Sequence, residues 1–147
     1  MKRDPCLDRL SRDHHQALTI ALRLTRATAD TVEQTRRELH EFWRDQGRLH
    51  FRVEEEVLLP AFAAYGDAYH PLIATTLCDH VAIRHRVDAR LSGPKPAPSA
   101  LHGLGIRLRE HVRMEERKLF PLIERSVPSA ALVALAVALQ QAEREAL

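Results

Sequence analysis

Two short segments of the chain carry the same arrangement of histidine, glutamate and proline. The first reads HFRVEEEVLLP from His50 and the second reads HVRMEERKLFP from His111, with six of the eleven positions identical. In each segment a glutamate follows the histidine by four residues, Glu54 in the first and Glu115 in the second. Residues four apart on a helix lie one turn apart on the same face, so the imidazole and carboxylate of each pair can reach one point.

A matching histidine lies upstream of each segment. Asp13-His14 precedes His50 and Asp79-His80 precedes His111, and the paired histidines lie 36 and 31 positions apart. The chain therefore reads as two copies of a helix pair that together supply four imidazoles and two carboxylates. Imidazole suits metals such as iron, zinc and copper, and facing helices of bundles build two-metal carboxylate sites from such side chains. The pattern predicts a site for two metal ions.

Apolar residues around the two motifs predict that these side chains are buried. Leu39, Trp43 and Val57 share a helical stripe with His50 and Glu54. Two unpartnered carboxylates in an apolar core would be costly, and a bound cation offsets that cost. The alternatives to a metal site are two ordinary surface ion pairs or a metal-free bundle.

The first helix offers two adjacent histidines as the metal-binding residue. His14 shares a face with Leu10, Ala17 and Ala21, whereas His15 is rotated toward Ser11. We therefore favour His14 over His15. The other histidines are expected at the surface: His40, His70, His85 and His102.

Acidic residues next to the predicted metal-binding residues have two interpretations. Asp13 and Asp79 are candidate hydrogen-bond acceptors that would hold the histidines in place. Glu55 and Glu116 directly follow the two metal-binding glutamates and are expected at the flank of the site, or on a solvated face. In the second case their partners would be the arginines at positions 52 and 113.

The elements that position these residues are all predicted to be helices. Asp4-Pro5 predicts the start of the first helix, Asp30 with Glu33 predicts a capping box for the second, and Ser99 predicts the cap of the fourth. Proline at position 60 is expected to kink the second helix. The predicted helices cover residues 5–28, 30 to beyond 60, 71–91, 99–121 and 130–146, with a proline-rich linker at 92–99. We predict a single all-α domain over residues 1–147: an up-down-up-down four-helix bundle (about 5–124) with an additional C-terminal helix (about 129–146), which packs across the bundle or against a second copy of the chain.

Composition narrows the class of protein. A formal net charge of +2 over 147 residues, with the arginines spread along the helices, gives no reason to expect a nucleic-acid partner. The longest apolar run, residues 130–139, is about half of what a membrane span needs. No secretory signal is apparent, and the two cysteines, Cys6 and Cys78, are expected to be free thiols, with a single bridge between them as the alternative. We expect a cytoplasmic protein.

The histidine and glutamate pattern, with the L-x-P that ends each segment, resembles the hemerythrin-like family, also called the HHE cation-binding domain. The resemblance covers residues 7–124 and implies a four-helix bundle that holds two iron ions in an Fe–O–Fe type centre with both glutamates bridging. Zinc and manganese are the alternative metals. Carried over position by position, the metal-binding residues would be His14, His50, Glu54, His80, His111 and Glu115.

At two positions this sequence differs from the oxygen-carrying members of the family that it resembles. Those proteins have a fifth histidine one turn after the third-helix histidine, where this chain has Arg84, and an aspartate at spacing five where this chain has Glu115 at spacing four. The chain is thus similar to the four-histidine, two-glutamate branch, which includes iron-sensing and iron–sulfur-centre repair proteins. The resemblance implies binding of, sensing of or reaction with a small ligand (dioxygen, nitric oxide or peroxide), or iron handling. The alternative is an interaction module with a structural metal that forms a homodimer through its last helix. No other residue resembles a general base or nucleophile, so the sequence does not decide whether the protein is an enzyme.

Overall fold

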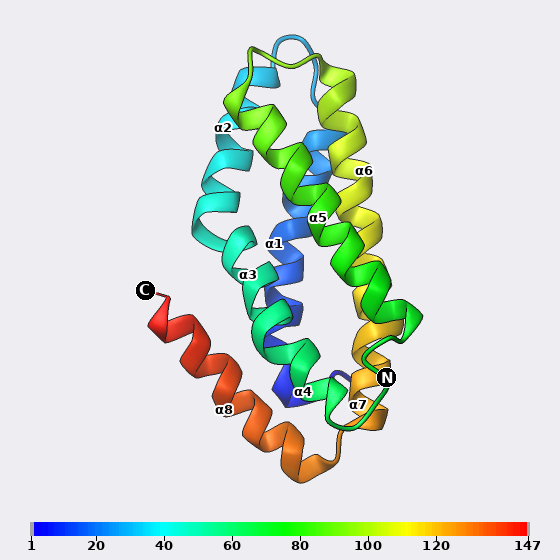
Figure 1. Cartoon of the computed structure of the whole chain (residues 1–147). Coiled ribbons are helices and arrows are strands. Elements are labelled where there is room, and N and C mark those ends of the chain that lie inside the picture. Colours follow the sequence, from blue (N-terminus) through cyan, green and yellow to red (C-terminus); the bar gives the residue numbers. More distant parts are fainter. Residues whose placement is uncertain (1, 147) are drawn as a thin grey trace.

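The chain folds into four long antiparallel helical segments and a fifth helix that crosses their lower end (Figure 1). A computed structural model describes residues 2–146, and these contain helices and turns but no strand. The predicted fold class, a helical bundle with an additional C-terminal helix, is confirmed. The segments are η1 (Pro5–Leu7) with α1 (Asp8–Thr25); α2 (Val32–Phe42), η2 (Trp43–Gly47), α3 (Arg48–Val53), η3 (Glu54–Leu58) and α4 (Leu59–Ala63) in one run; α5 (Pro71–Ser92); α6 (Pro98–Met114), η4 (Glu115–Leu119) and α7 (Phe120–Ser126) in one run; and α8 (Ser129–Glu145).

The prolines at positions 60 and 121 neither break nor end their helices. Before each of them the helix widens into a π turn, in which the Leu59 N–H donates to the Glu54 carbonyl and the Phe120 N–H donates to the Glu115 carbonyl. Proline has no N–H and its ring crowds the carbonyl four residues earlier, and a widened turn accommodates both effects. The fourth segment therefore continues to Ser126 instead of ending near Pro121. These two π turns begin at the glutamates of the repeated motif, and a third, η2, begins at Trp43.

Two of the predicted helix caps are wrong. Thr31, not Asp30, precedes α2, and its hydroxyl accepts a bond from the Thr28 N–H at 2.8 Å instead of capping the helix. The fourth segment starts one residue before Ser99, at Pro98, whose fixed φ suits the first helical position. Asp4 does act as a cap, because its carboxylate accepts from the Cys6 N–H at 2.8 Å.

The apolar interior is divided into two clusters. One occupies the end of the bundle that α8 covers and includes Leu7, Leu58, Phe120 and the inner face of α8 (Leu132, Leu135 and Leu139). The other lies at the opposite end and contains Leu24, Leu39, Trp43, Val87 and Leu104. The predicted metal-binding residues contact both clusters, since His14 stacks on Phe120 of the first and His80 stacks on Phe51 of the second. The last helix thus packs across the bundle, one of its two predicted placements.

A close approach of α1 to α6 fixes two of the helices that position the site. A Cβ atom at Gly105 would lie 2.7 Å from the Ala21 carbonyl oxygen and 2.8 Å from the Leu24 Cβ. A glycine is therefore required for α6 to lie this near α1.

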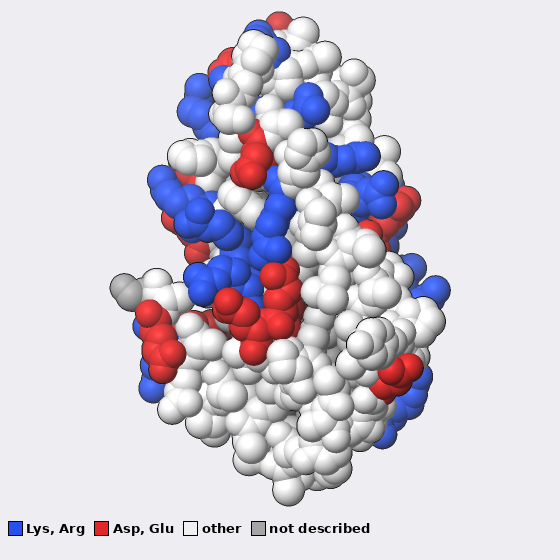
Figure 2. Space-filling view, viewed as in Figure 1, with Lys and Arg blue, Asp and Glu red and all other residues white. Residues whose placement is uncertain are grey.

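The surface differs between the middle and the lower end of the bundle. Figure 2 shows acidic and basic side chains side by side at mid-height, over α3 and α5, and few charged side chains over the lower end. Among residues 2–146, no helix is both long and apolar enough to cross a membrane. Both cysteines are free, Cys6 in the interior and Cys78 at the surface.

Candidate metal centre

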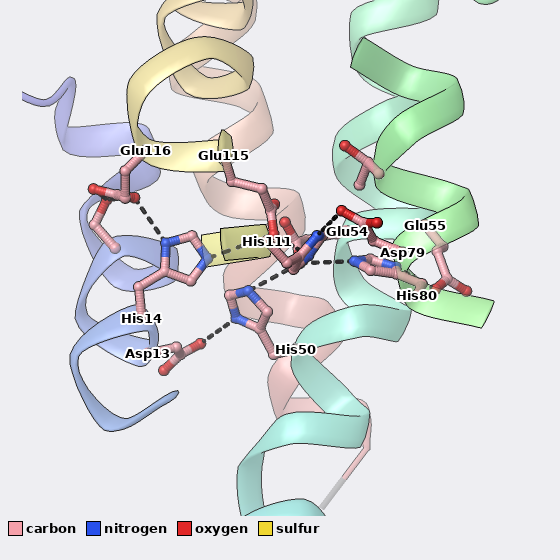
Figure 3. Close-up of polar contacts among 12 residues, drawn as sticks. Asp13, His14, His50, Glu54, Glu55, Asp79, His80, His111, Glu115 and Glu116 are labelled. Atoms are coloured by element: carbon pink, nitrogen blue, oxygen red, sulfur yellow. Dashed lines mark hydrogen bonds and ion pairs between the residues drawn. The ribbon is translucent and has the colours of Figure 1, made fainter. Parts of the chain in front are cut away.

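All six predicted metal-binding residues meet in the middle of the bundle (Figure 3). The four segments each supply one imidazole, and the two carboxylates stand at the first residues of the π turns η3 and η4. All six side chains are buried, with exposed fractions between 0 and 8%. The structure thus brings together residues that lie as much as 101 positions apart in the sequence, His14 and Glu115.

The six side chains form two groups that share both glutamates. One group contains His14 and His50 and is called the first position; the other contains His80 and His111 and is called the second position. Within each group, the nitrogen and oxygen atoms offered for binding lie within 4.8 Å of one another. This is the arrangement expected of two neighbouring metal ions joined by two carboxylates.

Each glutamate faces one imidazole of each position. The Oε1 atom of Glu54 lies 2.9 Å from the His50 Nε2 and 3.6 Å from the His80 Nε2. Glu115 lies correspondingly, with Oε1 2.5 Å from the His111 Nε2 and 3.8 Å from the His14 Nε2. Both carboxylates are therefore placed to bridge the two positions.

The polar atoms that face the centre form no regular hydrogen bond, and their close contacts, such as that of His111 with Glu115, are with one another. They are the Nε2 atoms of the four histidines and both carboxylate oxygens of Glu54 and Glu115. Buried polar atoms are nearly always paired, because an unpaired one costs about 1–3 kcal/mol. Eight such atoms directed at one point fit cations, and nitrogen and oxygen donors of this kind suit iron, zinc or manganese.

The opposite edge of every imidazole is held by a carboxylate. Asp13 accepts from the His50 Nδ1 and Asp79 accepts from the His111 Nδ1, both at 3.0 Å, as predicted for these aspartates. A bond from Nδ1–H to a carboxylate leaves the Nε2 lone pair of a neutral imidazole directed toward the centre. The four rings are thus oriented for binding.

Glu116 and Glu55 hold the other two imidazoles, a role that the sequence did not reveal. Glu116 accepts from the His14 Nδ1 at 2.8 Å and Glu55 accepts from the His80 Nδ1 at 2.6 Å. These glutamates flank the site as predicted, and Arg52, the arginine considered as a surface partner of Glu55, pairs with Glu56 instead. Each aspartate thus holds a histidine of its own repeat, whereas each glutamate holds a histidine of the other repeat. The available signal was the identical Glu-Glu doublet in both motifs.

Protons balance the charge of the metal-free centre. Burial and the neighbouring Glu115 raise the pKa of Glu54 to about 8, whereas Glu115, although buried, has its pKa held well below the usual range, chiefly by the charge of His111. Burial alone would lower the pKa of His111, but Glu115 and Asp79 raise it to about 10. Burial lowers the pKa of His80 to about 4. Since metals bind neutral imidazole and ionised carboxylate, metal binding here displaces protons.

The remaining histidines lie outside the centre. His15 is exposed, as are His40 and His85, whereas His14 is buried within the first position. His102 bonds to the Ala27 carbonyl at 2.7 Å, and His70 caps α5 by accepting from the Leu72 N–H at 3.0 Å. The choice of His14 over His15 agrees with this geometry.

A narrow apolar cavity adjoins the first position. Its volume is about 20 Å³, enough for roughly one water-sized molecule. It reaches the side chains of His14, His50 and His111. Its other walls are mainly apolar residues of the cluster at the end of the bundle opposite α8: Leu39, Trp43, Ile83, Val87 and Leu104. A small uncharged molecule fits this space better than a polar one.

The fold and this set of side chains define an all-helical protein with a buried candidate site for metal ions. The chain belongs to the hemerythrin HHE cation-binding domain family, whose match covers residues 7–123. No curated protein and no solved structure gives a significant match.

Proposed function

We propose that this metal-binding protein is a non-haem di-iron protein that binds, senses or reacts with dioxygen, nitric oxide or peroxide, or that handles iron. The observation that carries the proposal is the set of eight buried polar atoms that face only one another, in two groups that share Glu54 and Glu115. His14 and His50 would hold one ion, His80 and His111 would hold the other, and the two carboxylates would bridge them. When bound, two iron ions supply redox chemistry toward small ligands.

The protein's own residues contribute orientation and access. Four outer carboxylates accept from the Nδ1 atoms of the histidines: Asp13, Glu55, Asp79 and Glu116. They direct the Nε2 atoms inward, so that little rearrangement is needed for a metal to bind. The apolar cavity offers a route and a docking space for a small uncharged molecule beside the first position. Arg84 is bound to Glu55 at 2.8 Å and leaves the centre without a fifth histidine, which favours open metal coordination over closed.

Metal content and the optical spectrum test this proposal together. We expect two irons per chain and charge-transfer bands that change when the reduced protein meets air. One zinc per chain, or no metal, would contradict it. Nitric oxide and peroxide added to the reduced protein, in place of air, then distinguish among the small ligands.

A second candidate function is supported by the outer face of α8. Val133 and Val137 are 69% and 53% exposed there, one turn apart on a helix whose first eleven residues carry no charge. An interaction module with a structural metal would form a homodimer through this face. It predicts a closed metal site unreactive to air and a dimer that becomes monomeric when residues 128–147 are deleted.

We also propose a cytoplasmic location. The free thiol of Cys78 at the surface supports a reducing compartment. Fractionation of cells that express the full chain tests this location.

A further inference from the structure

Two arginines outside the metal-binding set occupy corresponding places in the structure. Arg84 of α5 donates to the Glu55 Oε1 at 3.1 Å, and the same nitrogen lies 2.8 Å from the Glu55 Oε2 as an ion pair. The same guanidinium lies over the ring of Phe51, 5.7 Å from its centroid. One arginine thus contacts two side chains that belong to the preceding segment of the bundle.

Both partners of Arg84 are in direct contact with His80. Glu55 accepts from the His80 Nδ1 at 2.6 Å. Phe51 stacks on the face of the imidazole, with centroids 3.8 Å apart and planes 7° apart. The edge and the face of this imidazole are therefore both fixed, and Arg84 joins the two side chains that fix them.

Arg3 forms a related arrangement around the imidazole of His14, although its closest carboxylate partner is Glu124. Its guanidinium lies 5.4 Å from the centroid of Phe120, and it donates to the Glu116 carbonyl at 2.7 Å, with the Glu116 carboxylate 3.6 Å away. Glu116 holds the His14 Nδ1 at 2.8 Å, and Phe120 stacks on the ring at 5.2 Å with planes 17° apart. Ser11 adds a hydroxyl bond to Glu116 at 2.8 Å.

The repeat does not account for this likeness. Arg84 follows its histidine by four residues, whereas Arg3 precedes its histidine by eleven. Phe51 directly follows a histidine of the motif, whereas Phe120 follows a glutamate of the motif by five. The two halves therefore reach one arrangement of arginine, glutamate and phenylalanine from non-equivalent positions in the sequence.

We propose that Arg84 and Arg3 are positioning residues for the imidazoles of His80 and His14. Each arginine holds a glutamate and a phenylalanine so that the ring keeps its plane and its Nε2 atom stays directed at the centre. Arginine suits this task because its planar guanidinium binds a carboxylate and covers an aromatic ring at the same time, which lysine does not. The inference rests on the proposed function, since it takes His80 and His14 to bind metal.

Cobalt(II) binding by the full chain tests the inference, because Co²⁺ reports each site through its visible absorption. Arg84→Gln should weaken one of the two Co²⁺-binding steps by about 10- to 100-fold, the usual effect of losing a group that orients a metal-binding histidine. The other step should stay within a factor of two to three. Arg3→Gln should show the same split, with the first position as the weakened one.

Arg86→Gln is the matched control. It lies on the same helix two residues further on, about 200° around the helix axis, and removes the same charge. Both Co²⁺ affinities and the spectrum should match those of the wild type. Unfolding of the metal-free variants measures their structural cost separately.

Double mutants separate positioning from general destabilisation. If Arg84 acts in part through Glu55, then the loss of Co²⁺ affinity in Glu55→Gln combined with Arg84→Gln should be smaller than the sum of the losses in the two single variants. Arg84→Lys should recover less than half of the lost affinity on a logarithmic scale. Unchanged Co²⁺ affinities in Arg84→Gln, or equal weakening of both steps, would overturn the inference, whereas a wild-type protein that binds no metal would overturn the proposed function.

Discussion

The first and second positions of the candidate metal centre have the same set of side chains but different surroundings. At the second position the outer carboxylates, Glu55 and Asp79, are 23% and 18% exposed, and both histidines are 1% exposed. At the first position the corresponding carboxylates, Glu116 and Asp13, are 31% and 35% exposed. The apolar cavity also reaches both histidines of the first position but only His111 of the second.

This difference separates the parts of the molecule that supply the side chains of the centre from the parts that set their exposure. The repeated motif supplies the metal-binding side chains and their carboxylate partners to both positions alike. Non-repeated parts set exposure and access: a phenylalanine stacks on one imidazole at each position, but the cavity borders both imidazoles of the first position and only one of the second. We therefore expect the first position to exchange metal and small molecules more readily.

Removal of a bridging carboxylate should have the largest effect, because each of the two carboxylates serves both positions. Glu54→Ala and Glu115→Ala should each lose most of the metal at both positions, since each carboxylate faces one imidazole of each position. Metal content per chain after dialysis measures this loss. Retention of both metals in either variant would show that the assignment of the metal-binding residues is wrong.

Loss of an outer aspartate should separate the two positions. Asp13→Asn and Asp79→Asn should each weaken one metal-binding step by about 10- to 100-fold. We expect the larger loss for Asp79, because it is the more buried partner and also lies 3.8 Å from Arg107. Titration with Co²⁺ ranks the two variants. The reverse order would contradict the view that the second position is the more enclosed one.

The stability of the metal-free protein should fall between about pH 7 and 10. The pKa of His111 is raised from 6.5 to about 10, so its contribution is complete below pH 6.5 and is lost as the pH rises through 10. The pKa of Glu54 is raised from 4.5 to about 8, so its contribution is lost as the pH rises through 8. Denaturant unfolding at pH 7 and pH 9 measures the fall.

The metal-loaded protein provides the control for this pH dependence. Bound metal takes the place of the protons, so its stability should not fall over the same range and metal binding should release protons into a weakly buffered solution. Equal pH dependence with and without metal would contradict this account of the centre.

The smallest effect is expected just outside the centre. Arg52→Ala breaks the exposed pair with Glu56, whose atoms lie 3.4 Å apart, and should change the free energy of unfolding by less than about 0.5 kcal/mol. Metal content should not change. A large loss of bound metal would show instead that Arg52 helps to hold the side chains of the centre in place.

The sequence predicted the helices and the inward side chains because both depend on local periodicity. Positions four apart on a helix share a face in any helical fold, so the predicted meeting of His50 with Glu54 needed no tertiary information. The contact of Glu116 with His14 depends on how two helices are rotated about their axes, which no spacing in the sequence reveals. The same holds for Arg3, which lies before the first helix and reaches Phe120 only in the folded bundle.

Helix ends were the least predictable part of the fold. Ser99 had the residue type of a cap, but Pro98 could start the helix without one. Pro121 had the residue type that ends a helix, and the π turn before it allowed the helix to continue. In both cases two local preferences competed, and the packing of the bundle decided between them.

The glutamates that reach across the bundle imply an order of events. Glu55 belongs to the first repeat and holds His80 of the second, while Glu116 belongs to the second and holds His14 of the first. Neither helix pair by itself contains a complete set of metal-binding and orienting side chains. Assembly of the two halves must therefore precede tight binding of metal during biosynthesis. A nascent chain of which only the first pair of helices has emerged would not retain metal ions.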